Sequence, residues 1–328
     1  MTASAPNREK TDLREKEARF FSLPAGMRCA WSLATVLYAA NLTLAFVLPY
    51  FSEHKATYAP GPYAVLLTSA YLLYVLQLLR GKKKSTSDIA LVLFAFFLLW
   101  ETSYKLGWIH NDLLIPSREG LFHVFVEKPG EIFADVLSSV RLLFTGVVFA
   151  IALGTVLGLL AGWIARVREV LLPISNVVTL IPPLMFSAYL IMLLPTFRAA
   201  ATGVIFFAVF WPTFQGTVAR VGQIDPAVIE AARTMGVGTS GMLWKVIFPY
   251  CLPGIIGSVS KSLRGAFMCL SGAEMLGINL GIGFFIEKYK SFADYRCVLA
   301  GIFTVGVVTT LIDIGVRKLE TILVRWTD

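Results

Sequence analysis

The sequence predicts an all-α polytopic membrane protein, and three observations support that fold class. Of the 328 residues, 56% are hydrophobic and only 15% are charged, which lies outside the range of soluble domains. Eight apolar runs are near or above the roughly 20 residues that a helix needs to cross a hydrocarbon core about 30 Å thick. The Lys and Arg residues lie between those runs, as membrane topology requires.

The eight predicted transmembrane helices follow a mixed-charge tail, residues 1–26. In chain order they are 27–50, 62–79, 88–109, 136–163, 171–194, 200–221, 249–276 and 294–316. An even number of spans places both termini on one side of the membrane. With the termini inside, the cytoplasmic segments hold 18 Lys and Arg and the outer loops hold 8, so the positive-inside rule predicts cytoplasmic termini. The tail shows no signal-peptide cleavage pattern, so none is expected to be removed.

Several other functions are disfavoured by the residue pattern. The net charge of +8 forms no dense basic patch, which argues against nucleic acid as a partner. The four cysteines show no paired spacing, and the three histidines have no second ligand nearby, so neither set predicts a metal site or a disulfide framework. No phosphate-binding loop of the Gly-x4-Gly-Lys-Ser/Thr type occurs, so we expect no ATP hydrolysis by this chain alone.

A short polar helix is predicted between the sixth and seventh spans, and it carries its own start and stop signals. Asp225 is placed to cap it, Pro226 suits its first turn, and Gly236 suits the left-handed residue that ends it. The charge bias places this loop in the cytoplasm. The alternative is an ordinary cytoplasmic helical turn between two spans, which would need only the cap, the proline and the glycine.

The same stretch resembles the signature loop of permease subunits of bacterial ATP-binding-cassette (ABC) importers. Glu230-Ala231-Ala232 is followed after three residues by Gly236 and later by Pro249. In that family the loop is a coupling helix that sits in a cleft of the cytoplasmic ATPase. The resemblance implies that the ATPase-coupling residues are Asp225, Pro226, Glu230, Ala231, Ala232, Gly236 and Pro249. The two alanines are small enough for close docking, and the glycine lets the chain turn sharply.

Further motifs are similar to the subfamily that imports nitrate, taurine, other sulfonates and bicarbonate. They lie at 100–101, 107–108, 114–117, 181–184, 212, 225–226, 252–255, 273–277 and 281–283. The resemblance implies a type I importer core of six helices at 88–328, with a cytoplasmic coupling loop at 222–248. An additional N-terminal helix pair at 27–87 lies outside that core, and its role is open. The turn at 193–198 departs from the Trp-Phe-Gly-type sequence of the subfamily, which puts the usual substrates in doubt.

The resemblance also implies partners. They are a second copy of the permease, two ABC ATPases and an extracytoplasmic substrate-binding protein, assembled in the lipid bilayer of the bacterial cytoplasmic membrane. No cofactor is expected on this chain, and ATP and Mg belong to the partner ATPase. Whether the two permease subunits are identical is open.

The substrate is left open by the sequence. A cationic path favours a small anion such as a sulfonate, taurine or nitrate, and a neutral vitamin or pyrimidine precursor is the alternative. An ion-coupled secondary transporter is a rival of another class, but it should show paired broken helices in two related halves.

Two sets of residues inside the spans are candidates for the translocation path. Pro182, Pro183 and Pro212 interrupt helices, which suits a path lined by freed carbonyls but equally a simple kink. Lys261 and Arg264 lie about 18 to 22 Å along the seventh span and three residues apart, hence on one face near mid-membrane. They could line a path for an anion, or pair structurally with Glu101, Glu274 or a second copy of the chain.

Glu101, Arg141 and Glu274 are the other charges expected within spans. Arg141 and Glu274 fall towards the outer ends of their spans, where side chains can reach the headgroups. We expect these three residues to serve in gating or as structural charges. Gly154, Gly158 and Gly162 line one face of the fourth span and predict close packing against a neighbouring helix.

Overall fold

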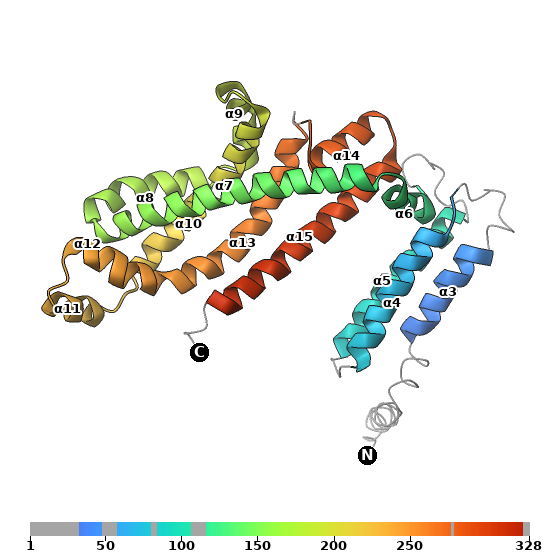
Figure 1. Ribbon diagram of the computed structural model, residues 1–328, viewed down its shortest axis with the longest axis horizontal. Coiled ribbons are helices and arrows are strands. Elements are labelled where there is room, and N and C mark those ends of the chain that lie inside the picture. Colours follow the sequence, from blue (N-terminus) through green and yellow to red (C-terminus); the bar gives the residue numbers. More distant parts are fainter. Residues whose placement is uncertain (1–32, 48–57, 80–83, 106–115, 277–278, 324–328) are drawn as a thin grey trace, which may run out of the picture. The chain divides into compact units, whose positions relative to one another are not determined.

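The computed structural model describes residues 33–47, 58–79, 84–105, 116–276 and 279–323, and Figure 1 shows its helices. These residues form helices and no β-strand, which confirms the predicted all-α class. By their contacts the chain divides into two compact units, residues 1–127 and 128–328. Each unit is held together by its own buried side chains.

The described residues of the first unit form four helices. They are α3 (Leu33–Val47), α4 (Gly61–Leu79), α5 (Lys84–Lys105) and α6 (Arg118–Glu127). Helix α5 packs against both α3 and α4, and α6 packs against α4. The two additional N-terminal helices and the first helix of the predicted six-helix core therefore share one unit. The predicted boundary after residue 87 stays a prediction.

The second unit contains the remaining elements. They are α7 (Pro129–Trp163), α8 (Ala165–Thr179), η2 (Pro183–Phe186), α9 (Ser187–Leu193), α10 (Phe197–Val221), α11 (Pro226–Thr234), α12 (Thr239–Gly241), η3 (Met242–Ile247), α13 (Phe248–Glu274), α14 (Ile282–Ser291) and α15 (Tyr295–Leu323). Buried side chains of α7, α10, α13 and α15 meet in one apolar core that includes Leu143, Ile205 and Phe267. Within this unit, α11 and α14 lie at opposite ends (Figure 1).

Length and composition qualify five described helices as membrane spans, namely α4, α5, α7, α10 and α15. The pair Ala165–Thr179 and Pro183–Leu193, bent by 92° at the break between them, makes a sixth if it is counted as one span. The first predicted span is described only over the 15 residues of α3, and the seventh corresponds to α13. The count of eight spans therefore stays a prediction.

The most extensive helix contact among the described residues joins α7 to α10, and glycines lie along it. Four glycines of α7 each face the residue of α10 that lies 59 positions further along the chain. The pairs are Gly146 with Ile205, Gly154 with Thr213, Gly158 with Thr217 and Gly162 with Val221. A Cβ atom added to any of these glycines would lie within 3.3 Å of its partner residue. A constant offset means that the two helices advance in the same direction. Small residues let parallel backbones approach closely in a membrane, so the predicted packing role of this glycine face is confirmed.

We expect Gly158→Ala to lower the melting temperature of the full-length chain in detergent. The new Cβ would lie 2.6 Å from the Thr217 Cβ and 3.0 Å from the Phe214 carbonyl oxygen, so the helices must separate. Overpacking of this kind typically costs about 1–3 kcal/mol. Gly306→Ala in α15 is the matched control, because its Cβ would meet no atom within 4 Å. Equal melting temperatures for the two variants would contradict the packing account.

Candidate functional site

Helix α11 is closed at both ends by hydrogen bonds that involve its predicted capping residues. The Asp225 carboxylate accepts the Ala227 backbone N–H at 2.9 Å, and Pro226 occupies the first turn. At the other end Gly236 has φ of 75°, a conformation that costs other residues more than glycine. Its N–H donates to the Arg233 carbonyl at 2.9 Å. The helix is therefore a defined unit.

One face of α11 belongs to the core of the second unit. Ala232 is buried in an apolar cluster that also contains Leu159, Val221, Ile224, Met242, Ile247, Cys251 and Ile255. The Arg233 guanidinium lies 6.0 Å from the centre of the Trp163 ring, at the end of α7. These contacts fix α11 to the ends of α7, α10 and α13, so a force on α11 reaches all three helices.

The opposite face of α11 is exposed. Glu230 and Ala231 lie on it, and Met235 at its end is 75% exposed. The sequence expectation grouped both alanines as docking residues. The structure separates them, because Ala231 faces outward while Ala232 packs against the chain's own core. An exposed face of small and apolar side chains around one carboxylate is suited to contact with another protein.

The chain enters the seventh predicted span directly from this loop. Residues Met242–Ile247 form a π-helical turn, and Pro249 stands in the first turn of α13 that follows. Proline has no N–H to donate and its ring crowds the carbonyl four residues back, so a widened turn suits this position. The loop and α13 are thereby joined through continuous helix.

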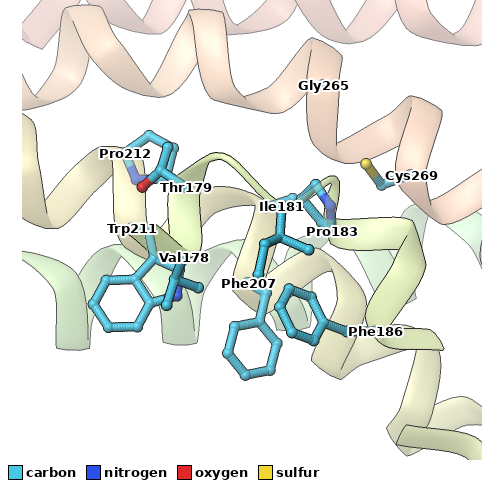
Figure 2. Close-up of a pocket in the computed structure, with 11 residues that line it drawn as sticks. Val178, Thr179, Ile181, Pro183, Phe186, Phe207, Trp211, Pro212, Gly265 and Cys269 are labelled. Carbon is cyan, nitrogen blue, oxygen red and sulfur yellow. The ribbon is translucent and has the colours of Figure 1, made fainter. Parts of the chain in front are cut away.

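The broken span surrounds a cavity in the second unit. Helix α8 ends at Thr179, and Pro182 and Pro183 begin the short turn η2. The cavity has a volume of about 250 Å³. It is lined by Val178, Thr179, Ile181, Pro183, Phe186, Phe207, Ala208, Trp211, Pro212, Gly265 and Cys269 (Figure 2). The structure thus brings two of the three predicted prolines, Pro183 and Pro212, to one cavity, and Pro182 to the break beside it.

Three of the eleven residues that line this cavity are aromatic, namely Phe186, Phe207 and Trp211. The Phe186 and Phe207 rings stack with centroids 5.1 Å apart, and Trp211 lies on the same side as Phe207 along α10 (Figure 2). Within the described part of the chain, the buried Trp211 indole N–H has no hydrogen-bond acceptor. Residues 207–212 lie about 14 to 21 Å along α10 from Val221, which is the middle of a hydrocarbon core about 30 Å thick. A largely apolar cavity at that depth can hold a small organic solute.

Lys261 and Arg264 lie on α13, a few residues before Gly265 and Cys269, which line the cavity. Arg264 immediately precedes Gly265, which lines the cavity. The side chains of both basic residues lie outside the described part of the chain. Both alternatives for these residues, lining the translocation path and forming a structural ion pair, therefore stay predictions.

Glu274 is fully buried and is held by neutral donors. The Ser139 hydroxyl donates to its Oε1 at 2.6 Å, and the Gly283 N–H donates to its Oε2 at 2.9 Å. Beside it, the Asp135 carboxylate accepts the Gly281 N–H at 2.8 Å. Backbone N–H groups at a helix start stabilise a carboxylate. These contacts join α7, α13 and the start of α14, which is a structural role for this carboxylate.

Two glycines make this arrangement possible. Gly281 has φ of 129°, and a Cβ there would collide with the Glu274 carboxylate. A Cβ at Gly283 would collide with the Ser271 carbonyl oxygen. The Gly-Ile-Gly motif at 281–283 is thus explained by close approach to Glu274.

A second contact fixes α14 to the start of α7. The Lys288 ammonium donates to Glu131 at 2.7 Å, and the Tyr289 hydroxyl donates to the same carboxylate at 2.8 Å. The hydrogen bond to Glu131 raises the pKa of Lys288 from its ordinary value. The ammonium therefore stays charged throughout the neutral range.

In the first unit, Glu101 pairs with Arg118, which lies in the predicted outer loop between the third and fourth spans. The Arg118 Nε lies 2.8 Å from Glu101 Oε2, and both side chains are buried. Arg118 Nη1 also donates to the Asn41 side-chain oxygen at 2.9 Å and to the Tyr63 hydroxyl at 2.7 Å. Glu119 lies 3.3 Å from the same guanidinium. One arginine thereby connects α3, α4, α5 and α6.

This cluster gives the two additional N-terminal helices a structural role. Asn41 comes from α3 and Tyr63 from α4, and the Arg118 guanidinium stacks 4.1 Å above the Tyr63 ring. A buried Glu in a span needs a polar partner, and a cation is one such partner; that requirement was the signal that could have pointed to Arg118. It could not select Arg118 over the other basic residues.

The fold and this site together define a class of protein. Long apolar helices, a span broken around a central cavity, and an exposed capped helix at one end are the parts of a membrane transport subunit. Residues 154–323 match the sequence profile of the family described as binding-protein-dependent transport system inner membrane component. The match covers just over half of the chain, and the chain belongs to this family.

Curated relatives carry the same assignment. The chain is 31% identical to the taurine transport system permease protein TauC of Escherichia coli over 187 residues, 56% of this chain and 66% of that protein. It is 29% identical to the putative aliphatic sulfonates transport permease protein SsuC of Bacillus subtilis over 230 residues, 70% of this chain and 83% of that protein. With the nitrate import permease protein NrtB of Synechocystis it shares 28% over 191 residues, 58% of this chain and 69% of that protein.

The resemblance to the nitrate, sulfonate and taurine permeases is thereby confirmed. The chain spans just under two thirds of the taurine permease and more of the other two. It is a multi-pass inner-membrane permease component of an ABC importer.

We expect Arg118→Leu to destabilise the full-length chain strongly, because the buried Glu101 and Glu119 carboxylates would lose the guanidinium that lies 2.8 and 3.3 Å from them. Removing one partner of a buried ion pair costs about 3–5 kcal/mol. Arg317→Leu is the control, since its pair with Asp313 is exposed and such pairs contribute about 0–1 kcal/mol. Thermal unfolding in detergent measures both.

A double variant separates the lost cation from lost packing. Arg118→Leu combined with Glu101→Leu should recover part of the loss, because the uncompensated charge on α5 is gone. A double variant no more stable than Arg118→Leu alone would contradict the role given to this pair.

Proposed function

We propose that the chain forms the translocation path of an ATP-driven importer and is coupled to its ATPase through α11. The observation that carries this proposal is the two-sided character of α11. One face is buried against the ends of α7, α10 and α13, and the other is exposed around Glu230 and Ala231. A helix with this geometry can be moved by an ATPase and can move the spans in turn.

The coupling residues have separate tasks. Asp225, Pro226 and Gly236 keep α11 a short closed helix, while Glu230 and Ala231 meet the ATPase. Ala232 and Pro249 connect the helix inward, through the core cluster and through α13. ATP binding closes the ATPase pair, α11 moves with it, and the spans change from inward-open to outward-open. Both sites then bias one conformational equilibrium, which is what coupling requires.

The assembly and topology follow from this proposal. Two ATPases, a substrate-binding protein on the outer side and a second permease copy complete the importer. ATP and Mg are held by the ATPases, and this chain binds no cofactor. Both termini lie in the cytoplasm, because the Lys and Arg residues at 80–84 and near the ends favour that side.

We propose a small organic anion, such as a sulfonate, as the transported solute. Taurine, aliphatic sulfonates and nitrate occur in the names of the relatives. The aromatic walls and the Trp211 N–H suit an apolar body with one polar end, and Lys261 and Arg264 on α13 would attract its charge. The same aromatic walls favour a neutral vitamin or pyrimidine precursor as the second candidate.

We expect Glu230→Lys and Gly236→Pro to leave membrane insertion intact and to abolish substrate-stimulated ATP hydrolysis. The first reverses the charge at the centre of the exposed face. The second requires φ near −65° where the native value is 75°, and it removes the N–H that bonds to Arg233. Coupling free energies are typically about 1–3 kcal/mol, so stimulation should fall roughly 5- to 150-fold.

The measurement is ATP hydrolysis by the purified complex in lipid vesicles, with and without loaded binding protein. Glu169→Lys is the matched control, since it reverses an exposed charge on α8 rather than on α11. Normal stimulation in the α11 variants would remove this helix from its role. Uptake that follows an ion gradient in the absence of ATP would replace the importer with a secondary transporter.

A further inference from the structure

The second unit has another cavity, and its charged side chains are two arginines. It has a volume of about 210 Å³ and is lined by Ser138, Arg141, Leu142, Thr145, Arg198 and Leu280. We propose that Arg141 and Arg198 bind a single compact oxyanion, such as a sulfonate or carboxylate, at the outer mouth of the permease. The inference rests on the proposed function, because it makes this cavity the first place where the permease holds the transported anion.

Both guanidinium groups are free to take such a ligand. Arg141 on α7 and Arg198 on α10 are exposed, and neither lies within 4.0 Å of a carboxylate of a described residue. The nearby carboxylates of Asp135 and Glu274 are occupied by N–H and hydroxyl donors. Two unpaired cations at one cavity repel each other, and an anion between them relieves that repulsion.

The two arginines lie at the same depth. Arg141 is about 33 Å along α7 from Trp163, and Arg198 is about 35 Å along α10 from Val221, at 1.5 Å per residue. Trp163 and Val221 both pack beside α11. With α11 in the cytoplasm, a hydrocarbon core about 30 Å thick places both guanidinium groups at the outer boundary. This is where a solute released outside would enter.

A positive charge at the position of Arg198 is unfavourable for the stability of α10. It stands in the first turn of the helix, where Thr196 caps the chain by accepting the Ala199 N–H at 3.1 Å. A cation there is opposed by the positive end of the helix dipole, whereas an anion is favoured by it. The turn that supplies Arg198 is also the segment 193–198 that departs from the subfamily pattern. An anion-binding role for Arg198 would explain why this turn departs from the subfamily pattern.

Donor groups for an oxyanion head group line the cavity. The forked guanidinium of arginine donates two parallel hydrogen bonds to an oxyanion. The Ser138 hydroxyl has no acceptor among the described residues and can donate as well. Leu280 also lines the cavity, and the next residue, Gly281, is fixed by Asp135. The site therefore needs little rearrangement to bind.

Site-resolved arginine modification tests the proposal on the full-length chain in lipid vesicles. Phenylglyoxal labels exposed guanidinium groups, and mass spectrometry of peptides reports the labelling rate of each arginine. Methanesulfonate is the probe, dimethyl sulfone its uncharged analogue, and sodium chloride the control for ionic strength. We expect methanesulfonate to slow the labelling of Arg141 and Arg198 together and saturably, about twofold at its dissociation constant. Exposed Arg317 should keep its rate.

Variants show whether the two arginines act as one site. Arg198→Gln should abolish the protection of Arg141, and Arg317→Gln should leave it unchanged. Equal protection by chloride or by dimethyl sulfone, equal slowing at Arg317, or unchanged labelling with methanesulfonate would overturn the proposal.

A lipid phosphate is the other source of the same chemistry. If it were the ligand, the two arginines would be protected before any probe is added, and protection would differ between phosphatidylglycerol and phosphatidylcholine vesicles. That outcome would also overturn the proposal. Because the readout needs neither ATP nor a partner, failure here is distinct from failure of coupling at α11.

Discussion

The close parallel packing of α7 and α10 is the constraint on which the rest of the second unit depends. Glycines on α7 bring the two backbones together at a constant register. At one end, the same two helices supply Leu159 and Val221 to the core under α11. At the other end they carry Arg141 and Arg198, and between the ends α10 carries one wall of the aromatic cavity. A pair packed this closely suits the coupling proposed between α11 and the rest of the permease.

Buried carboxylates are the second constraint, and the two units satisfy them differently. Glu101 is paired with Arg118, whose remaining donors reach α3 and α4. Glu274 has neutral donors, Ser139 and Gly283, which join α7, α13 and α14. Each carboxylate would be costly among apolar helices without these partners. Two of the three charges expected to gate or support the permease, Glu101 and Glu274, are points where helices are joined, whereas Arg141 lines the outer cavity.

The features predicted correctly from sequence are local or periodic. The caps of α11 depend on Asp225 and Gly236 within one turn, and the glycine face on α7 repeats every four residues. The features that were missed depend on distant contacts. Arg118 acquires its role from Glu101, Asn41 and Tyr63, and Ala232 turns inward because of the core below it. Neither the 92° bend after α8 nor the pairing of Arg198 with Arg141 at one cavity is visible in spacing alone.

The central claim is that this permease works through an ATPase docked on α11. Native mass spectrometry of the complex, isolated from its own membranes through a tag on this chain, tests it most directly. The account predicts a mass that contains two permease copies, two ATPases and a binding protein, with any retained ligand identifying the solute. Recovery of the chain alone or only with itself, in detergents that keep comparable importers intact, would contradict the account.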